Sequence, residues 1–215
     1  MKLCRFVHPS SAEPRYGLIE ADLIYPVEEH ELFVPDEPLL FLKAPSAAIG
    51  DNDVIELPRQ SQQVEHEGEL AVIIGRKARR ISDGENPLDY VLGYTCINDV
   101  TARDLQRKDV QFTRGKSFDT FCPIGPVIVT DINPLDVEVV TRVNDAVKQR
   151  GRTSEMAFPV PFLIKYIAEI MTLFPGDVIA TGTPSGVSAL KPGDLVTVEV
   201  EGIGSLRNQV EQFHQ

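Results

Sequence analysis

The chain has 215 residues, of which 42% are hydrophobic and 25% are charged, and its formal net charge is −11. A chain of this length can bury a full core, which predicts one main domain with at most a small appendage. Asp and Glu outnumber Lys and Arg by 32 to 21, and this excess argues against nucleic acid or an anionic membrane surface as a partner. No apolar run approaches the ~20 residues of a transmembrane helix, so we expect no membrane span.

The cysteines indicate a reducing compartment. Cys4, Cys96 and Cys122 are widely separated and form no Cys-x-x-Cys pair. An odd number of cysteines with this spacing favours free thiols that pack in the core. The first residues are strand-like and lack the apolar segment of a secretory signal. These features together predict a cytoplasmic protein.

The pattern of apolar residues predicts many short strands and few helices. We expect strands at Leu3–Val7, Tyr16–Glu20, Leu23–Val27, Leu70–Ile74, Val91–Asn98, Pro123–Val129, Val137–Asn144, Val178–Thr181 and Leu195–Glu201, and a polar loop at Thr113–Phe118. Helical spacing predicts a helix over Pro159–Leu173, and Thr101 with Asp104 resembles a capping box that starts a second helix. Because strands and helices do not alternate regularly, the fold class is predicted to be α+β and strand-rich.

Residues 26–58 contain many prolines and acids, which is typical of an irregular connection. We therefore expect two parts in the chain. Residues 1–58 would form a small N-terminal β unit with a lid or linker, and residues 59–215 would form the main domain.

Two glutamates precede the apolar strand at 70–74. Glu67 and Glu69 lie two residues apart, so their side chains would share one face of an extended strand, whereas His66 would point the other way. Adjacent carboxylates repel each other and are costly to desolvate, and a divalent cation with oxygen ligands would relieve both costs. Asp99, at the end of the next apolar strand, could supply a third carboxylate. The alternative is a solvated strand end, because Glu-x-Glu is a common tripeptide.

Seven segments together resemble one known family. They are His66–Gly75, Gly93–Tyr94, Asn98–Asp104, Lys116–Asp119, Pro123–Pro126, Val143–Asn144 and Thr181–Val187. Their order and approximate spacing are similar to those of the fumarylacetoacetate hydrolase family, from about Leu39 to the C-terminus. The chain looks most like the small members that act as acylpyruvases or oxaloacetate decarboxylases.

The resemblance implies a mixed β-sandwich roll, a homodimer, and Mg²⁺ or Mn²⁺ held by Glu67, Glu69 and Asp99. In crystals, Ca²⁺ could take the place of either metal ion. A small anionic 2-oxo acid would chelate the metal, which as a Lewis acid stabilises the enolate formed when a C–C bond breaks. The predicted reaction is therefore acylpyruvate hydrolysis or oxaloacetate decarboxylation. The alternatives are an isomerase/decarboxylase of the 2-hydroxyhepta-2,4-diene-1,7-dioate type, a member that binds metal and 2-oxo acid without turnover, and a structural β module.

An anionic substrate needs cations beside three carboxylates. The resemblance places Lys116 there as a catalytic and substrate-binding residue, together with Arg103. Gln106 follows Arg103 by one helical turn and could bond the same substrate carboxylate. Thr183 matches a residue that contacts substrate, and Lys43 matches a lysine near the site. The alternatives are a salt bridge between Arg103 and a surface acid, and solvated lysines.

The sequence departs from the family just after the N-terminal hairpin. Family members carry Gly-x-Asn-Tyr there and then a lid helix with His-x-x-Glu, whose His–Glu pair activates water for hydrolysis. Glu29 falls at the position of the lid Glu and is a predicted catalytic residue, but Pro26 stands where the His should be, and His30 comes one place too late. Either the protein lacks this segment, or the 215-residue sequence omits it at Val27/Glu28. Without the pair, decarboxylation or tautomerisation should survive better than hydrolysis.

Overall fold

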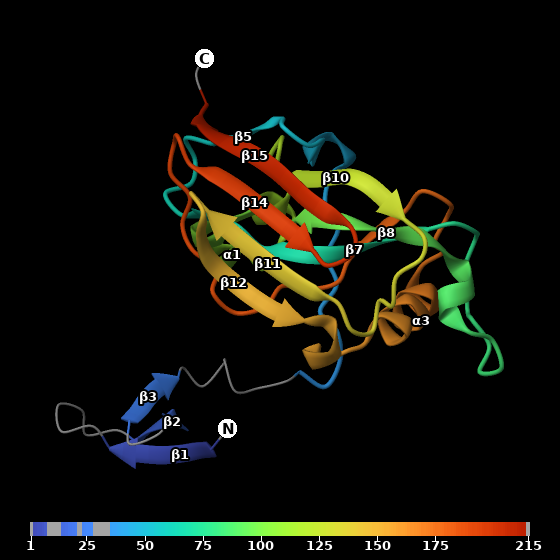
Figure 1. The fold of residues 1–215 in the computed structure, drawn as a ribbon, viewed down its shortest axis with the longest axis horizontal. Helices are drawn as coiled ribbons and strands as arrows, with labels where there is room; N and C mark the ends of the chain where they lie inside the picture. Colours follow the sequence, from blue (N-terminus) through green and yellow to red (C-terminus); the bar gives the residue numbers. More distant parts are fainter. Residues whose placement is uncertain (1, 8–13, 21–22, 28–34, 214–215) are drawn as a thin grey trace. The chain divides into compact units, whose positions relative to one another are not determined.

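The computed structural model describes residues 2–7, 14–20, 23–27 and 35–213, and the chain forms two compact units, residues 1–38 and 39–215. The first unit contains one antiparallel sheet of three strands, β1 (Lys2–Val7), β2 (Pro14–Glu20) and β3 (Leu23–Val27), shown in Figure 1. β2 and β3 pair antiparallel, with Tyr16 opposite Val27 and Glu20 opposite Leu23. The three strands predicted at the start of the chain are therefore confirmed.

Two five-stranded sheets build the second unit. The first has the order β13-β7-β8-β10-β4 and the second the order β12-β11-β14-β15-β5, and β6 and β9 form a separate short ladder. The strands are β4 (Ala48–Ile49), β5 (Val54–Leu57), β6 (Val64–Glu65), β7 (Gly68–Ile74), β8 (Val91–Asn98), β9 (Thr101–Ala102), β10 (Cys122–Val129), β11 (Glu138–Val143), β12 (Ala146–Arg152), β13 (Val178–Ala180), β14 (Leu195–Val200) and β15 (Gly204–Gln212). Most neighbours are antiparallel, but β4 and β5 each pair parallel. The sheets are therefore mixed, and the α+β, strand-rich class predicted from the sequence is confirmed.

Helices are few and short. They are α1 (Arg103–Lys108), α2 (Thr113–Lys116) and α3 (Val160–Ile170), with 3₁₀ turns η2 (Pro45–Ala47), η3 (Pro87–Tyr90) and η4 (Thr153–Glu155). α3 confirms the predicted long helix and is shorter than expected at both ends. None of the helices in the described part of the chain has the length and apolar content needed to cross a bilayer.

Two predictions near α1 and α2 are wrong. The capping box does not form, because α1 starts after Ala102 without a side-chain cap. The Thr101 hydroxyl instead donates to the Asp99 carbonyl oxygen at 2.8 Å, and Asp104 accepts from the Ser61 hydroxyl at 2.6 Å. α2 forms where a polar loop was expected, because the tertiary contacts of the segment outweigh its weak local preference.

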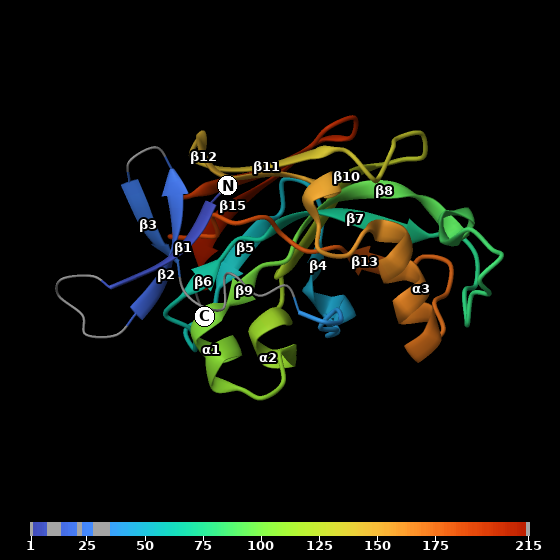
Figure 2. The ribbon, with the colours of Figure 1, turned by 90° about the horizontal axis from the view of Figure 1, so that it is seen from below.

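The two five-stranded sheets face each other and enclose the main core (Figures 1 and 2). Its buried residues come from β7, β8, β11, β14, β15 and α3, and include Leu70, Val72, Ile74, Tyr94, Val139, Ile164, Val198 and Leu206. A second cluster joins Val100, Ala102 and Leu105 to Phe121 and Ile55. The chain around β9 and α1 is therefore anchored in a core of its own.

The residues between 39 and 58 belong to the second unit. β4 pairs with β10, and β5 pairs with β15 through Val54 opposite Gln209. The boundary predicted from the sequence lies after residue 58, whereas the boundary between the compact units lies between Pro38 and Leu39. A separate role for residues 1–58 as a lid or linker stays a prediction.

Strand alternation decides which face of β7 each side chain takes. Leu70, Val72 and Ile74 enter the core between the sheets, so Glu69 must lie on the opposite face. Gly68 lies on the core face, where a Cβ atom would come within 2.0 Å of the Thr141 hydroxyl oxygen. The absence of a side chain at position 68 therefore lets the two sheets approach each other directly behind the glutamates.

Replacing Gly68 by Ala should destabilise the fold, because the added methyl group would push β7 away from Thr141 and Val198. Overpacking of this kind costs about 1–3 kcal/mol, measurable as a lower midpoint in urea unfolding. Gly84→Ala is the matched control, because no atom lies within 4 Å of a Cβ built there. Equal midpoints for the two variants would contradict this account.

Candidate metal and substrate site

The site lies where two antiparallel ladders meet. β7 pairs with β8, with Gly68 opposite Asn98, and β6 pairs with β9, with Glu65 opposite Thr101. The same register places Glu67 opposite Asp99, and the Asp99 amide donates to the Glu67 carbonyl oxygen at 2.8 Å. Strand pairing thus brings together carboxylates that are 32 residues apart in the sequence.

Glu67, Glu69 and Asp99 form a compact carboxylate cluster. One ligand oxygen from each lies within 4.8 Å of the others, and all three residues are buried. Burial, together with the charges of Asp99 and Glu67, raises the pKa of Glu69 well above its ordinary value. Three carboxylates held this close and out of water are a costly arrangement unless cations compensate them.

The donor set of this cluster fits a divalent metal ion. All three groups offer carboxylate oxygens, the ligands that Mg²⁺, Mn²⁺ and Ca²⁺ prefer. Backbone groups also fix the cluster. The Gly182 amide donates to Glu69 Oε2 at 2.7 Å, and the Glu67 amide donates to Asn98 Oδ1 at 2.9 Å. The carboxylates are therefore positioned by rigid strands and can hold a cation between them.

Lys116 of α2 reaches directly into the cluster. Its Nζ donates to Glu67 Oε2 at 2.7 Å and to Asp99 Oδ2 at 2.6 Å, and the side chain is almost fully buried. Burial alone would lower the pKa of Lys116, but Asp99 and Glu67 outweigh it and raise the pKa above its ordinary value. Lys116 is therefore a buried ammonium group, and the alternative of a solvated loop lysine is wrong.

Lys43 lies on the other side of Asp99. Its Nζ donates to Asp99 Oδ1 at 2.5 Å and to the Val100 carbonyl oxygen at 3.3 Å. Nearby, the Phe41 ring lies with its centroid 4.9 Å from the Lys116 Nζ. The segment before η2 thus supplies a cation and an aromatic wall, and the alternative of a surface lysine at position 43 is wrong.

Arg103, the first residue of α1, is held by two glutamates. Its Nε donates to Glu65 Oε2 at 2.8 Å. One terminal nitrogen donates to Gln106 Oε1 at 2.5 Å, and the other forms an ion pair with Glu67. Burial would lower the pKa of Arg103, but Glu67 and Glu65 raise it. The acidic partners of Arg103 are buried residues of the site, so the alternative of a surface salt bridge is wrong.

Glu65 is a member of the site that sequence reasoning missed. It is buried, and its Oε1 accepts from Gln63 Nε2 at 2.6 Å while its Oε2 accepts from Arg103. A signal was present, because Glu65, Glu67 and Glu69 alternate along the chain. We expect Glu65 to hold the guanidinium in place.

Thr183 lies in the loop that follows β13. Its hydroxyl donates to the Gly68 carbonyl oxygen at 2.8 Å and accepts from Gln149 Nε2 at 2.7 Å. His66 bonds Gln149 and Ser188 and faces away from the carboxylates, in agreement with its exclusion as a ligand. Gln149 and Ser188 carried no sequence signal, because single polar residues on strands and loops are usually solvated.

The predicted lid residues cannot be compared with the structure. Glu29 and His30 lie outside the described residues, which resume at residue 35. The role of Glu29 in hydrolysis therefore stays a prediction.

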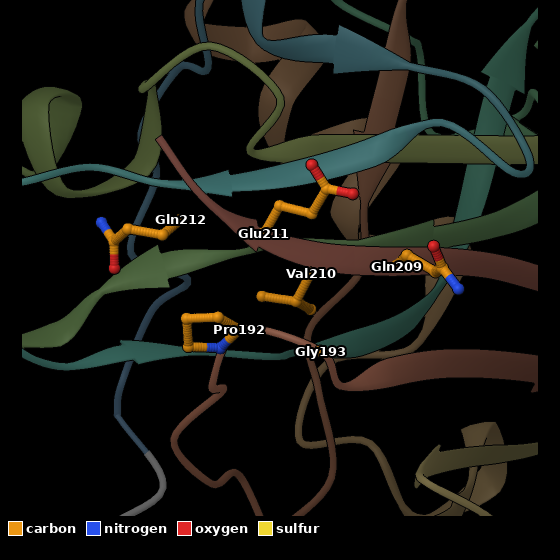
Figure 3. Close-up of a pocket in the computed structure, with 6 residues that line it drawn as sticks. All are labelled: Pro192, Gly193, Gln209, Val210, Glu211 and Gln212. Carbon is orange, nitrogen blue, oxygen red and sulfur yellow. The ribbon is translucent and has the colours of Figure 1, made fainter. Parts of the chain in front are cut away.

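A separate hollow of about 220 Å³ lies beside β15 (Figure 3). It is lined by Pro192, Gly193 and Gln209 to Gln212. Glu211 is its single ionisable side chain, and none of the predicted site residues lines it. Chemistry that needs converging charges is therefore assigned to the carboxylate cluster.

The fold and the cluster define a strand-rich α+β domain with a candidate divalent-metal site. Residues 21–211 match the protein family described as "Fumarylacetoacetate (FAA) hydrolase C-terminal". The chain therefore belongs to the fumarylacetoacetate hydrolase family.

Several known proteins are similar to this chain. The uncharacterized protein MJ1656 of Methanocaldococcus jannaschii is 53% identical over 184 residues, which cover 86% of this chain and 77% of MJ1656. Oxaloacetate tautomerase YisK of Bacillus subtilis is 44% identical over 191 residues, which cover 84% of this chain and 63% of YisK. The crystal structure of 2-hydroxyhepta-2,4-diene-1,7-dioate isomerase from Mycobacterium marinum matches with a TM-score of 0.82 and 48% identity, over 85% of this chain and 72% of that one.

Replacing Glu69 by Gln should weaken Mn²⁺ binding by at least about 10–100-fold, because one carboxylate ligand is lost. The metal-free variant should unfold at an equal or higher temperature than the original protein, because a buried like charge is removed. Titration calorimetry and thermal unfolding measure the two effects. Glu211→Gln, at an exposed position of β15, is the control. Unchanged Mn²⁺ affinity in Glu69→Gln would refute a metal site at the cluster.

Proposed function

We propose that this protein is a divalent-metal-dependent enzyme that acts on small 2-oxo acids. The observation that carries the proposal is the buried carboxylate cluster with three cationic side chains around it, Lys43, Arg103 and Lys116. Cations beside a metal site attract an anionic substrate, and buried ones bind it more strongly than solvated ones would. Membership of the family supports the same substrate class.

Glu67, Glu69 and Asp99 would hold the metal ion, Mg²⁺ or Mn²⁺. A cation bound there would act as a Lewis acid and withdraw electron density from a substrate oxygen. Hydrogen bonds to backbone amides hold two of these ligand residues in place. The Gly182 amide donates to the Glu69 carboxylate, and the Asp99 amide donates to the backbone carbonyl oxygen of Glu67.

The cations divide two further tasks. Lys116 lies beside two of the proposed metal ligands, and its ammonium would donate a hydrogen bond to the keto oxygen as negative charge develops there. Arg103, held by Glu65 and Gln106, offers a planar donor group that suits a carboxylate of the substrate. Lys43 and the Thr183 hydroxyl complete the set of proposed substrate contacts.

Keto–enol tautomerisation is the reaction that these residues support best. It moves one proton between carbon and oxygen of the 2-oxo acid and requires no activated water. The described site has donors for the charged oxygen. The names of two similar proteins, an oxaloacetate tautomerase and a dienedioate isomerase, agree with this reaction class.

Cleavage of a C–C bond, the reaction predicted from the sequence, is the second candidate. Oxaloacetate decarboxylation passes through the same kind of enolate, and the presence of Lys43 and Arg103 on two sides of the cluster would accommodate a dicarboxylic substrate. Acylpyruvate hydrolysis requires a base as well, and its proposed source, Glu29, lies outside the described residues. Assembly as a homodimer and a cytoplasmic location stay predictions of the sequence.

Removal of the metal separates these proposals. With Mg²⁺ or Mn²⁺ present, the protein should accelerate the loss of the enol absorbance of freshly dissolved oxaloacetate, and EDTA should abolish the effect until excess metal is added back. Pyruvate formation, followed with lactate dehydrogenase, reports decarboxylation in the same sample. Activity on neither oxaloacetate nor acylpyruvates with the metal bound would overturn the enzymatic proposal in favour of a binding role.

Replacing Lys116 by Met should lower kcat by about 10²–10³-fold, because a charged donor to the developing oxyanion is lost. Mn²⁺ affinity should be equal or higher, because the ammonium no longer competes for Glu67 and Asp99. Lys165→Met, at a surface ion pair with Asp83, is the matched control. A loss of Mn²⁺ binding in Lys116→Met with unchanged turnover per bound metal would contradict this role.

A further inference from the structure

The loop after β13 runs along the strand that carries the metal ligands. The Thr181 hydroxyl donates to the Leu70 carbonyl oxygen at 2.8 Å, and the Gly182 amide donates to Glu69 Oε2 at 2.7 Å. The Thr183 hydroxyl then donates to the Gly68 carbonyl oxygen at 2.8 Å. Three successive loop residues thus contact three successive residues of β7. The position of the loop therefore determines where the Thr183 hydroxyl lies relative to the carboxylates.

Gln149 of β12 fixes that loop through its side-chain amide. Its Nε2 donates to Thr183 Oγ1 and to the Pro184 carbonyl oxygen, both at 2.7 Å. Its Oε1 accepts from the Gly68 amide at 3.1 Å and from His66 Nδ1 at 2.9 Å. All four hydrogen-bonding sites of the amide are used, and the residue is 1% exposed. Its orientation is therefore unique.

The network also fixes the tautomer of His66. Because Gln149 Oε1 can only accept, the hydrogen must lie on His66 Nδ1. In the neutral ring, His66 Nε2 then accepts from the Ser188 hydroxyl at 2.9 Å. Ser188 lies at the far end of the same loop. The buried polar network therefore holds the loop at two points, Thr183–Pro184 and Ser188.

Close backbone approach brings the loop against β12. A Cβ atom at Gly186 would lie 2.0 Å from the Lys148 carbonyl oxygen, and one at Gly151 would lie 2.8 Å from the Pro184 ring. Gly186 also has a φ of +104°, a backbone conformation that residues with a side chain rarely adopt. These contacts leave the loop little freedom to shift along the edge strand.

We propose that Gln149 is a positioning residue, which holds the Thr183 hydroxyl at the metal cluster for the bound 2-oxo acid. The inference rests on the proposed function of that site. Gln149 contacts no carboxylate of the cluster and acts through Thr183 and the Gly68 backbone. Its amide links the loop, β12 and the ligand strand, so that the substrate contact and the metal ligands keep a fixed relation. Preorganisation of this kind strengthens binding without a direct contact.

The test measures oxalate binding to the Mn²⁺-loaded protein by titration calorimetry, because oxalate is a planar dianion that resembles the enolate form of a 2-oxo acid. Gln149→Met keeps the length of the side chain and removes all four hydrogen bonds. This variant should weaken oxalate binding by about tenfold. It should change Mn²⁺ affinity by less than about threefold, because Gln149 contacts none of the proposed metal ligands through their carboxylates. Gln209→Met, at an exposed position on β15, is the matched control and should change neither.

A double-mutant cycle with Thr183→Val separates positioning from general damage. If Gln149 acts through Thr183, Gln149→Met should weaken oxalate binding little further in the Thr183→Val protein. An equal tenfold loss in that background, or unchanged oxalate affinity in Gln149→Met alone, would overturn the inference.

Ser188→Ala provides a second, milder variant if Gln149→Met does not fold. It removes the other anchor of the loop and should weaken oxalate binding by about threefold, within the usual range for one neutral hydrogen bond; no change would count against the inference. Should the original protein bind Mn²⁺ and no oxalate, the proposed function itself would fail, and the inference would fall with it.

Discussion

Burial of like charges is the constraint on which the rest of this structure depends. Glu67, Glu69 and Asp99 bring three carboxylate oxygens within 4.8 Å in the protein interior, and such a cluster is costly unless cations lie beside it or one carboxyl group takes up a proton. The chain meets this requirement with Lys43, Arg103 and Lys116, which come from three separate segments. A divalent metal ion would compensate the same negative charges. The three cationic side chains would then be free to attract a substrate anion.

The strands hold this arrangement with little freedom. A shift of one residue in the pairing of β7 with β8 would turn the glutamates toward the core and the apolar residues toward the site. Leu70, Val72 and Ile74 prevent that shift because they fill the core between the sheets. Gly68 lets the second sheet approach from behind. On the other strand, Val100 and Ala102 are anchored in the second cluster. Stability of the fold and placement of the ligands are therefore produced by the same contacts.

The proposed substrate contacts come from segments that are less regular. Lys43 precedes a 3₁₀ turn, Lys116 ends a four-residue helix, and Thr183 belongs to a loop. Each is held by specific hydrogen bonds: Lys43 to Asp99, Lys116 to Glu67 and Asp99, and Thr183 to Gly68 and Gln149. The proposed substrate contacts are therefore held separately from the strand pairing that positions the carboxylates.

Local patterns in the amino-acid sequence were enough to predict most of the strands, helix α3 and the carboxylates of the candidate site. Alternation of apolar residues and the spacing of Glu67 and Glu69 are local properties, and they survive folding unchanged. Only the tertiary structure decided the rest. β12 has the polar sequence Ala146–Arg152 and forms because β11 pairs with it, and the Thr101 hydroxyl bonds Asp99 rather than capping α1. Glu65, Gln149 and Ser188 acquire their roles from partners 34 or more residues away. Contacts between distant segments leave no periodic pattern in a single sequence, and for that physical reason they could not be predicted.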